Sequence, residues 1–149
     1  MIIRVQQQDF DLSAVNRELL RGRHDAGAVA SFVGLVRDLE EGGLRQMTLE
    51  HYPGMTEKAL QSICDRACER WQVLDLAVIH RVGDLNPGDQ IVMVSVLGAH
   101  RGDAFAACEF IMDYLKTDAP FWKKETSDGG EQWVESRQSD FDKQREWGE

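Results

Sequence analysis

The stretch QIVMVSVLGAH, residues 90–100, is the most apolar segment of the chain and gives the strongest indication of its fold. A short, nearly continuous run of valine, isoleucine and leucine is typical of a strand buried on both faces, so we expect it at the centre of a sheet. The segment before it, VLDLAVIHRVGDL at 73–85, reads as a second strand. Between them Pro87 and Gly88 suit the two central positions of a tight turn.

Three other segments have the spacing of amphipathic helices. They cover DLSAVNRELLRG at 11–22, PGMTEKALQSICDRACERW at 53–71 and DAFAACEFIMDYLKTDA at 103–119. Asp11 can cap the first helix and Gly22 can end it. Pro120 ends the third, because the residue before a proline is pushed out of helical geometry.

The remaining segments are predicted to form strands. The first is a short strand, IIRVQQ at 2–7. A hairpin around the EEGG turn would be formed by residues 26–38 and 44–52. A second hairpin, turning at SDGG, would be formed by FWKKETSDGGEQWVES at 121–136. Strands lie between long helices in a mixed order, which indicates the α+β class. We expect one domain over residues 1–149, in which about 140–149 is a loose tail or a short helix.

The composition narrows the functional class. A net charge of −9 and a pI of about 4.9 argue against a general nucleic-acid binder, although they allow a local basic pocket. We see neither an apolar run of membrane-span length nor a signal peptide, so we expect a cytoplasmic protein that binds no membrane. Three cysteines give no disulfide framework, and no ligand spacing indicates a metal.

The segment DYLKTDAPFWKKE, residues 113–125, holds three of the five lysines in this acidic chain. Lys116, Lys123 and Lys124 could form a site that holds an anion. The alternative is an ordinary solvated corner, with Lys116 at the negative end of a helix dipole. Strand alternation sends Lys123 and Lys124 to opposite faces of the hairpin, so both enter one pocket only if a bulge intervenes.

Two further groups of cations stand at the ends of strands. His100 and Arg101 precede the third helix, and a helix N-terminus with these side chains suits a phosphate or carboxylate. The alternative is that Asp103 simply caps the helix while Arg101 lies on the surface. Arg37 follows the strand at 26–38, and it is equally well explained as a surface charge.

The third helix separates these groups. Its ends lie about 20 Å apart, at 1.5 Å per residue. Arg101 and Lys116 of one chain therefore cannot easily touch the same small ligand. A symmetric dimer with its sites at the interface would bring them together, and we state this as a hypothesis.

Three long segments carry a resemblance to a known family. LEHYPGMTEKAL (49–60), HRVGDLNPGDQIVMVSVLGAHR (80–101) and FIMDYLKTDAPFWKKE (110–125) together resemble the large, catalytic subunit of molybdopterin synthase, the MoaE family. The similarity extends from Gly27 to about Glu135. Three long segments in the right order are far more specific than any single short motif.

The resemblance implies an enzyme, a sulfurtransferase of molybdenum cofactor biosynthesis. Such enzymes convert cyclic pyranopterin monophosphate into molybdopterin by inserting two sulfurs as a dithiolene. The sulfur arrives as a thiocarboxylate on the C-terminal Gly-Gly of a small ubiquitin-like subunit. The large subunit is a homodimer that forms a heterotetramer with two small subunits, and it needs neither metal nor nucleotide. The implied fold is the α/β-hammerhead with an additional antiparallel sheet.

The resemblance also assigns roles to residues. It places the catalytic lysine of the DYLKT motif at Lys116 and the second important lysine at Lys123. Substrate contacts are expected from the following positions, the first of which is often lysine in this family: Leu35, Val36, Arg37, His100, Arg101, Lys116, Lys123, Lys124 and Glu125. We expect Lys116 to assist proton transfer during sulfur attack, and Lys123 to stabilise developing negative charge.

Two other functions stay open at this point. The chain could be a non-catalytic module that binds a ubiquitin-like Gly-Gly tail through its basic pocket. It could also be an anion-binding α+β protein with no connection to sulfur. Turnover would distinguish the enzyme from the binding module. A complex with a Gly-Gly-tailed partner would distinguish the binding module from the anion-binding protein.

Overall fold

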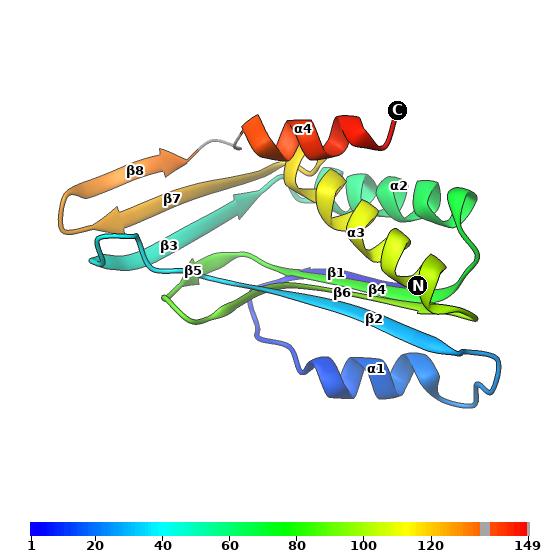
Figure 1. Ribbon diagram of the computed structural model, residues 1–149. Helices are drawn as coiled ribbons and strands as arrows, with labels where there is room; N and C mark the ends of the chain where they lie inside the picture. Colours follow the sequence, from blue (N-terminus) through cyan, green and yellow to red (C-terminus); the bar gives the residue numbers. More distant parts are fainter. Residues whose placement is uncertain (135–137, 149) are drawn as a thin grey trace.

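The computed structural model describes residues 1–134 and 138–148, and Figure 1 shows an α+β architecture with two sheets. The first sheet has the strand order β1 (Ile2–Gln6), β4 (Val73–Arg81), β6 (Gln90–Gly98) and β2 (Ala28–Leu35). β1 runs parallel to β4, and the other neighbours are antiparallel. The apolar stretch that begins at residue 90 therefore forms an interior strand, as predicted.

The second sheet is antiparallel throughout, in the order β5 (Gly83–Leu85), β3 (Leu44–His51), β7 (Phe121–Ser127) and β8 (Gly130–Val134). The predicted hairpin at SDGG is confirmed by the pairing of Ser127 with Gly130.

Two strand predictions were wrong. The segments 26–38 and 44–52 do not pair as a hairpin, because β2 pairs with β6 of the first sheet and β3 with β7 of the second. The segment 73–85 is two strands in different sheets. Gly83, with a φ of +89°, turns the chain between them, a conformation that glycine adopts without steric cost.

Helices cover both faces of the first sheet (Figure 1). α1 (Leu12–Leu20) lies on one face, while α2 (Met55–Arg70) and α3 (Arg101–Asp118) lie on the other. The predicted cap is present, since the carboxylate of Asp11 accepts a hydrogen bond from the N–H of Ala14. α4 (Gln138–Glu146) packs against α3, and Trp147 beyond it donates a 2.8 Å hydrogen bond to Asp113.

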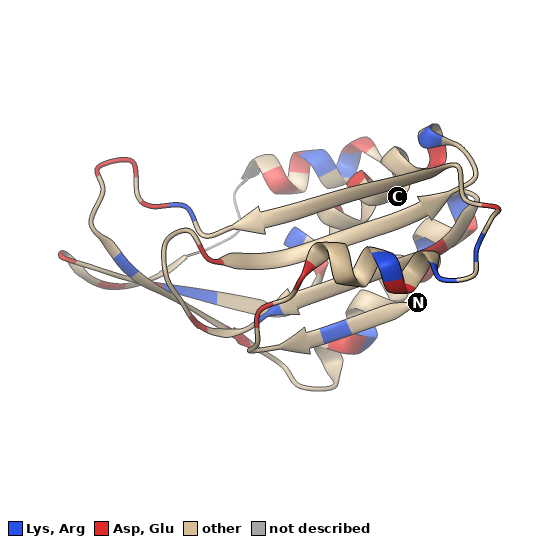
Figure 2. Ribbon diagram, turned by 90° about the horizontal axis from the view of Figure 1, so that it is seen from below, with Lys and Arg blue, Asp and Glu red and all other residues tan. Residues whose placement is uncertain are grey.

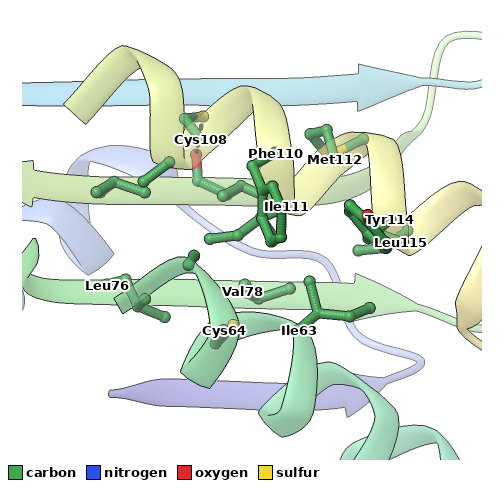
Figure 3. Close-up of a cluster of buried hydrophobic side chains, with 14 of the residues drawn as sticks. Ile63, Cys64, Leu76, Val78, Cys108, Phe110, Ile111, Met112, Tyr114 and Leu115 are labelled. Atoms are coloured by element: carbon green, nitrogen blue, oxygen red, sulfur yellow. Dashed lines mark hydrogen bonds between the residues drawn. The ribbon is translucent and has the colours of Figure 1, made fainter. Parts of the chain in front are cut away.

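The largest hydrophobic cluster lies between the first sheet and the α2–α3 pair (Figure 3). Cys64 and Cys108 are buried within it, and the Cys108 thiol lies 3.8 Å from the carbonyl oxygen of Val94. Burial raises the pKa of the Cys64 thiol to about 12 and that of Cys108 to about 11. Both thiols are therefore protonated at neutral pH and pack as small apolar side chains. Among the described residues, no helix is long and apolar enough to cross a membrane.

Candidate functional site

The segment singled out in the sequence forms the junction between α3 and β7. Lys116 lies in the last turn of α3, where its charge meets the negative end of the helix dipole, and its side chain is exposed. The helix ends at Asp118, two residues before Pro120. β7 starts at Phe121, whose N–H donates to the carbonyl oxygen of Ala119 at 2.9 Å. This short connection places Lys116 and the β7 lysines at two sides of one corner.

Lys123 and Lys124 point to opposite faces of the second sheet. Both sit in regular register, opposite Leu49 and Thr48 of β3, so no bulge brings them to one side. Lys124 lies on the face of Trp133, with its ammonium 5.7 Å from the ring centroid, and pairs with Glu131 at 3.7 Å. One chain therefore does not bring both lysines into a single pocket.

Lys123 shares its face with two histidines. His80 stacks on Phe121, with ring centroids 3.8 Å apart and an interplanar angle of 17°. The pKa of His80 is lowered to about 4, chiefly by burial and to a smaller extent by the nearby charges of Lys123 and His51. His51 lies opposite Phe121 in the β3–β7 pairing. At neutral pH His80 is consequently an uncharged ring beside the lysine.

The end of β2 lies close to this face. Val36 is buried in a cluster with Leu49, and Leu49 is the cross-strand partner of Lys123. Hydrogen bonds to the 86–89 turn fix the backbone of Val36. The Val36 N–H donates to the carbonyl oxygen of Asp89, and the Val36 carbonyl oxygen accepts from the N–H of Gly88. The flanking side chains, Leu35 and Arg37, are both exposed. The structure thus anchors this strand end beside the sheet that carries Lys123.

His100 and Arg101 lie at the other end of α3. His100 is the N-cap residue but makes no side-chain capping bond, and both side chains are exposed. The alternative that Asp103 caps the helix is wrong, because its carboxylate instead accepts from the backbone N–H of Gln72 at 3.1 Å. The Asp103 carboxylate is therefore occupied by a hydrogen bond to the loop after α2, and His100 is the N-cap residue of α3.

The candidate site therefore consists of two groups in one chain. Lys116, Lys123 and Glu125 lie toward the second sheet, with Arg37 at the strand end beside it, whereas His100 and Arg101 lie a full helix length away. In the described residues no three His, Cys, Asp or Glu side chains gather as a possible metal site. In Figure 2, a ribbon seen from below, basic and acidic positions are interspersed along the chain.

The fold and these cations define an α+β protein with exposed cationic groups suited to small anions, and the comparisons give its family. The sequence matches the MoaE protein family over residues 5–118. It is 59% identical to the "Molybdopterin synthase catalytic subunit" of Ralstonia nicotianae, covering 98% of this chain and 84% of that protein. The chain belongs to the MoaE family, whose curated relatives carry that description.

Solved structures agree with this assignment. The structure of "Molybdopterin biosynthesis MoaE protein from Burkholderia ambifaria MC40-6" superposes with a TM-score of 0.86 at 55% identity, over 99% of this chain and 98% of that one. A "protein-protein complex of subunit 1 and 2 of Molybdopterin-converting factor" from Helicobacter pylori gives a TM-score of 0.77 at 21% identity, with 92% of each chain covered, and shares the fold. The predicted family and α+β class are therefore confirmed.

His80 was not among the candidate site residues predicted from the sequence. Its position beside Lys123 depends on the first sheet meeting β7, which is more than 40 residues away along the chain. The one local signal was its place directly after the apolar run LAVI at 76–79, where a buried polar group needs a reason.

Proposed function

We propose that this chain is the sulfur-transferring catalytic subunit of a molybdopterin synthase, acting on cyclic pyranopterin monophosphate. The observation that carries the proposal is the corner between α3 and β7, where an acidic chain of this family exposes Lys116 and Lys123. Both expected reactants are anions, a cyclic phosphate and a thiocarboxylate. Because the net charge of −9 repels them and screening limits that repulsion to about 8 Å, capture falls to local cations.

In each of the two proposed transfers, the partner's thiocarboxylate sulfur attacks a side-chain carbon of the pterin, and the C–S bond forms as a C–O bond at that carbon breaks. Water then cleaves the acyl–sulfur bond, which leaves the sulfur on the pterin and a carboxylate on the partner's terminal glycine. Lys116 would donate a proton to the oxygen that leaves this carbon, and Lys123 would stabilise the negative charge that develops. The forked guanidiniums of Arg37 and Arg101 would hold the phosphate, with His100 assisting.

The other proposed contacts have different positions. Leu35 and Val36 would place Arg37 and border the substrate at the end of β2. Glu125 shares the face of Lys123, so it could orient that ammonium. Lys124 occupies the opposite face, and we propose that it contacts substrate or partner from that face of the sheet.

A homodimer would complete the site. β2 is an edge strand, and its exposed apolar side chains include Phe32 (41% exposed) and Leu35 (57%). An edge of this kind is a template for pairing with another strand. Antiparallel pairing of two β2 strands would place the Ala28 end of one copy beside the Leu35 end of the other. Since Ala28 pairs with Gly98, that same end carries the start of α3.

The consequence is a site built from two chains. Arg101 and His100 of a second copy would then lie near the first copy's Arg37 and Lys116. The length of α3, which keeps Arg101 and Lys116 of one chain apart, would no longer prevent them from contacting the same ligand. We further propose a small ubiquitin-like partner with a Gly-Gly thiocarboxylate, giving a heterotetramer in the cytoplasm. The description of relatives as a "catalytic subunit" supports a further subunit, and the Helicobacter pylori complex contains two.

A single-turnover experiment tests the proposed function. This protein would be mixed with cyclic pyranopterin monophosphate and the thiocarboxylated small subunit, and dithiolene product followed with parent and Lys116→Ala side by side. Product from the parent with at least a hundredfold loss in the variant is expected, as for removal of a general acid. Partner binding without product from the parent would favour the non-catalytic Gly-Gly-binding module. Equal product from both proteins would remove Lys116 from the chemistry.

A further inference from the structure

His80 is a buried polar residue that no proposed step of the reaction uses. It lies near the end of β4, an interior strand, and only 5% of its surface is exposed. Along β4 it alternates with Ile79, which faces α1, so His80 points toward the side of α2 and α3. A histidine in such a place costs desolvation free energy relative to an apolar residue, and this cost calls for a function.

The ring of His80 is held in one orientation. Its Nδ1 lies 2.8 Å from the backbone carbonyl oxygen of Arg81. A carbonyl oxygen only accepts, so Nδ1 carries the proton and Nε2 keeps its lone pair. One hydrogen bond therefore fixes both the tautomer and the plane of the ring.

The fixed ring supports the first residue of the strand that carries Lys123. Phe121 lies flat against His80, at 3.8 Å and 17°. Lys123 follows two residues later on the same face, in unbroken register with Leu49. Its charge is near enough to His80 to lower the pKa of the imidazole. The two sheets thus meet through an aromatic pair directly before the lysine.

We propose that His80 is a positioning residue, which fixes the start of β7 through Phe121 and so places the Lys123 ammonium beside the corner that holds Lys116. Its neutral ring adds no positive charge to a site already rich in cations. This inference rests on the proposed function for the role of Lys123 in catalysis. The placement of Lys123 by His80 can nevertheless be tested without turnover.

Lysine reactivity provides that test, with Lys124 as an internal reference on the other face of the same strand. Parent, His80→Phe and His80→Ala would be labelled with trace acetic anhydride, and acetylation at each lysine measured by fragment-ion mass spectrometry. We expect His80→Ala to change the Lys123 to Lys124 ratio at least threefold, and His80→Phe, which keeps an aromatic ring against Phe121, to change it less than twofold. A general loosening of the sheet would alter both lysines together.

Turnover then connects the placement to the reaction. In single-turnover assays His80→Ala should lose at least tenfold in rate while binding the small subunit as the parent does, and His80→Phe should keep most of its rate. An unchanged reactivity ratio in His80→Ala, or equal rates for all three proteins, would overturn the proposal. Full activity of Lys123→Ala would instead refute the catalytic role of Lys123 and leave the reactivity result standing.

Discussion

Acid should destabilise this protein through His80. The pKa of this residue is about 4 in the folded chain, against an ordinary value of 6.5, chiefly because the ring is buried. Above pH 6.5 the ring is neutral in both states. Between pH 6.5 and pH 4 the unfolded chain binds a proton that the folded chain does not. The free energy of unfolding therefore falls as the pH falls through this window.

The size of the effect follows from the two pKa values. Linkage over one proton gives a loss of about 2 kcal/mol in unfolding free energy between pH 7 and pH 5. Other groups also titrate, among them Asp113, whose carboxyl pKa is raised by burial and whose contribution has the opposite sign. A variant that cannot titrate at position 80 isolates the histidine. His80→Phe should show a loss over this range that is smaller by about 2 kcal/mol.

Urea denaturation followed by circular dichroism at pH 7, 6 and 5 measures this difference. His24→Phe is the matched control, because it makes the same substitution at an exposed histidine. Lys123 and His51 are the charged or titratable groups near the His80 ring. Glu57 is linked to them through His51, since its Oε1 lies 4.0 Å from the His51 Nε2. A parent and a His80→Phe variant with the same pH dependence would refute the reasoning that burial keeps His80 neutral.

Two other predictions concern burial and close approach. Native protein at pH 8 treated with iodoacetamide should be modified first at the half-buried Cys68, whereas Cys64 and Cys108 should react only after unfolding, as peptide mass spectrometry would show. Fast modification of Cys108 in folded protein would contradict the packing. Gly27→Ala should lower the unfolding free energy by about 1–3 kcal/mol, because its Cβ would lie 2.1 Å from a backbone oxygen before α3. Gly102→Ala is its control in open space, and equal melting temperatures for the two variants would count against this contact.

Much of the secondary structure could be predicted from the sequence. The helices α1, α2 and α3 and the strand β6 were predicted because periodicity and apolar runs are local signals. The pairing of β2 with β6 was missed, since strand partners are chosen by packing between segments far apart in the chain. A local turn pattern therefore suggested the wrong hairpin. The single-domain boundaries stay a prediction.

The candidate site was predictable to a similar degree. The sequence correctly predicted that Lys123 and Lys124 point to opposite faces, because successive side chains of a regular strand alternate between its two faces. The length of α3 correctly separated Arg101 from Lys116. The contact of His80 with β7 could not be foreseen, since it depends on how the two sheets meet. The roles of all these side chains in catalysis stay proposals.

The central claim is that each active site takes residues from two copies of the chain. Arg101→Ala and Lys116→Ala chains carrying different tags would be co-expressed, and the mixed dimer purified and assayed for dithiolene formation. Each variant alone should be inactive. The mixed dimer should recover about half of the parent rate, because one of its two sites has both residues intact. A mixed dimer as inactive as the two single variants would contradict a shared site and would confine each site to a single chain.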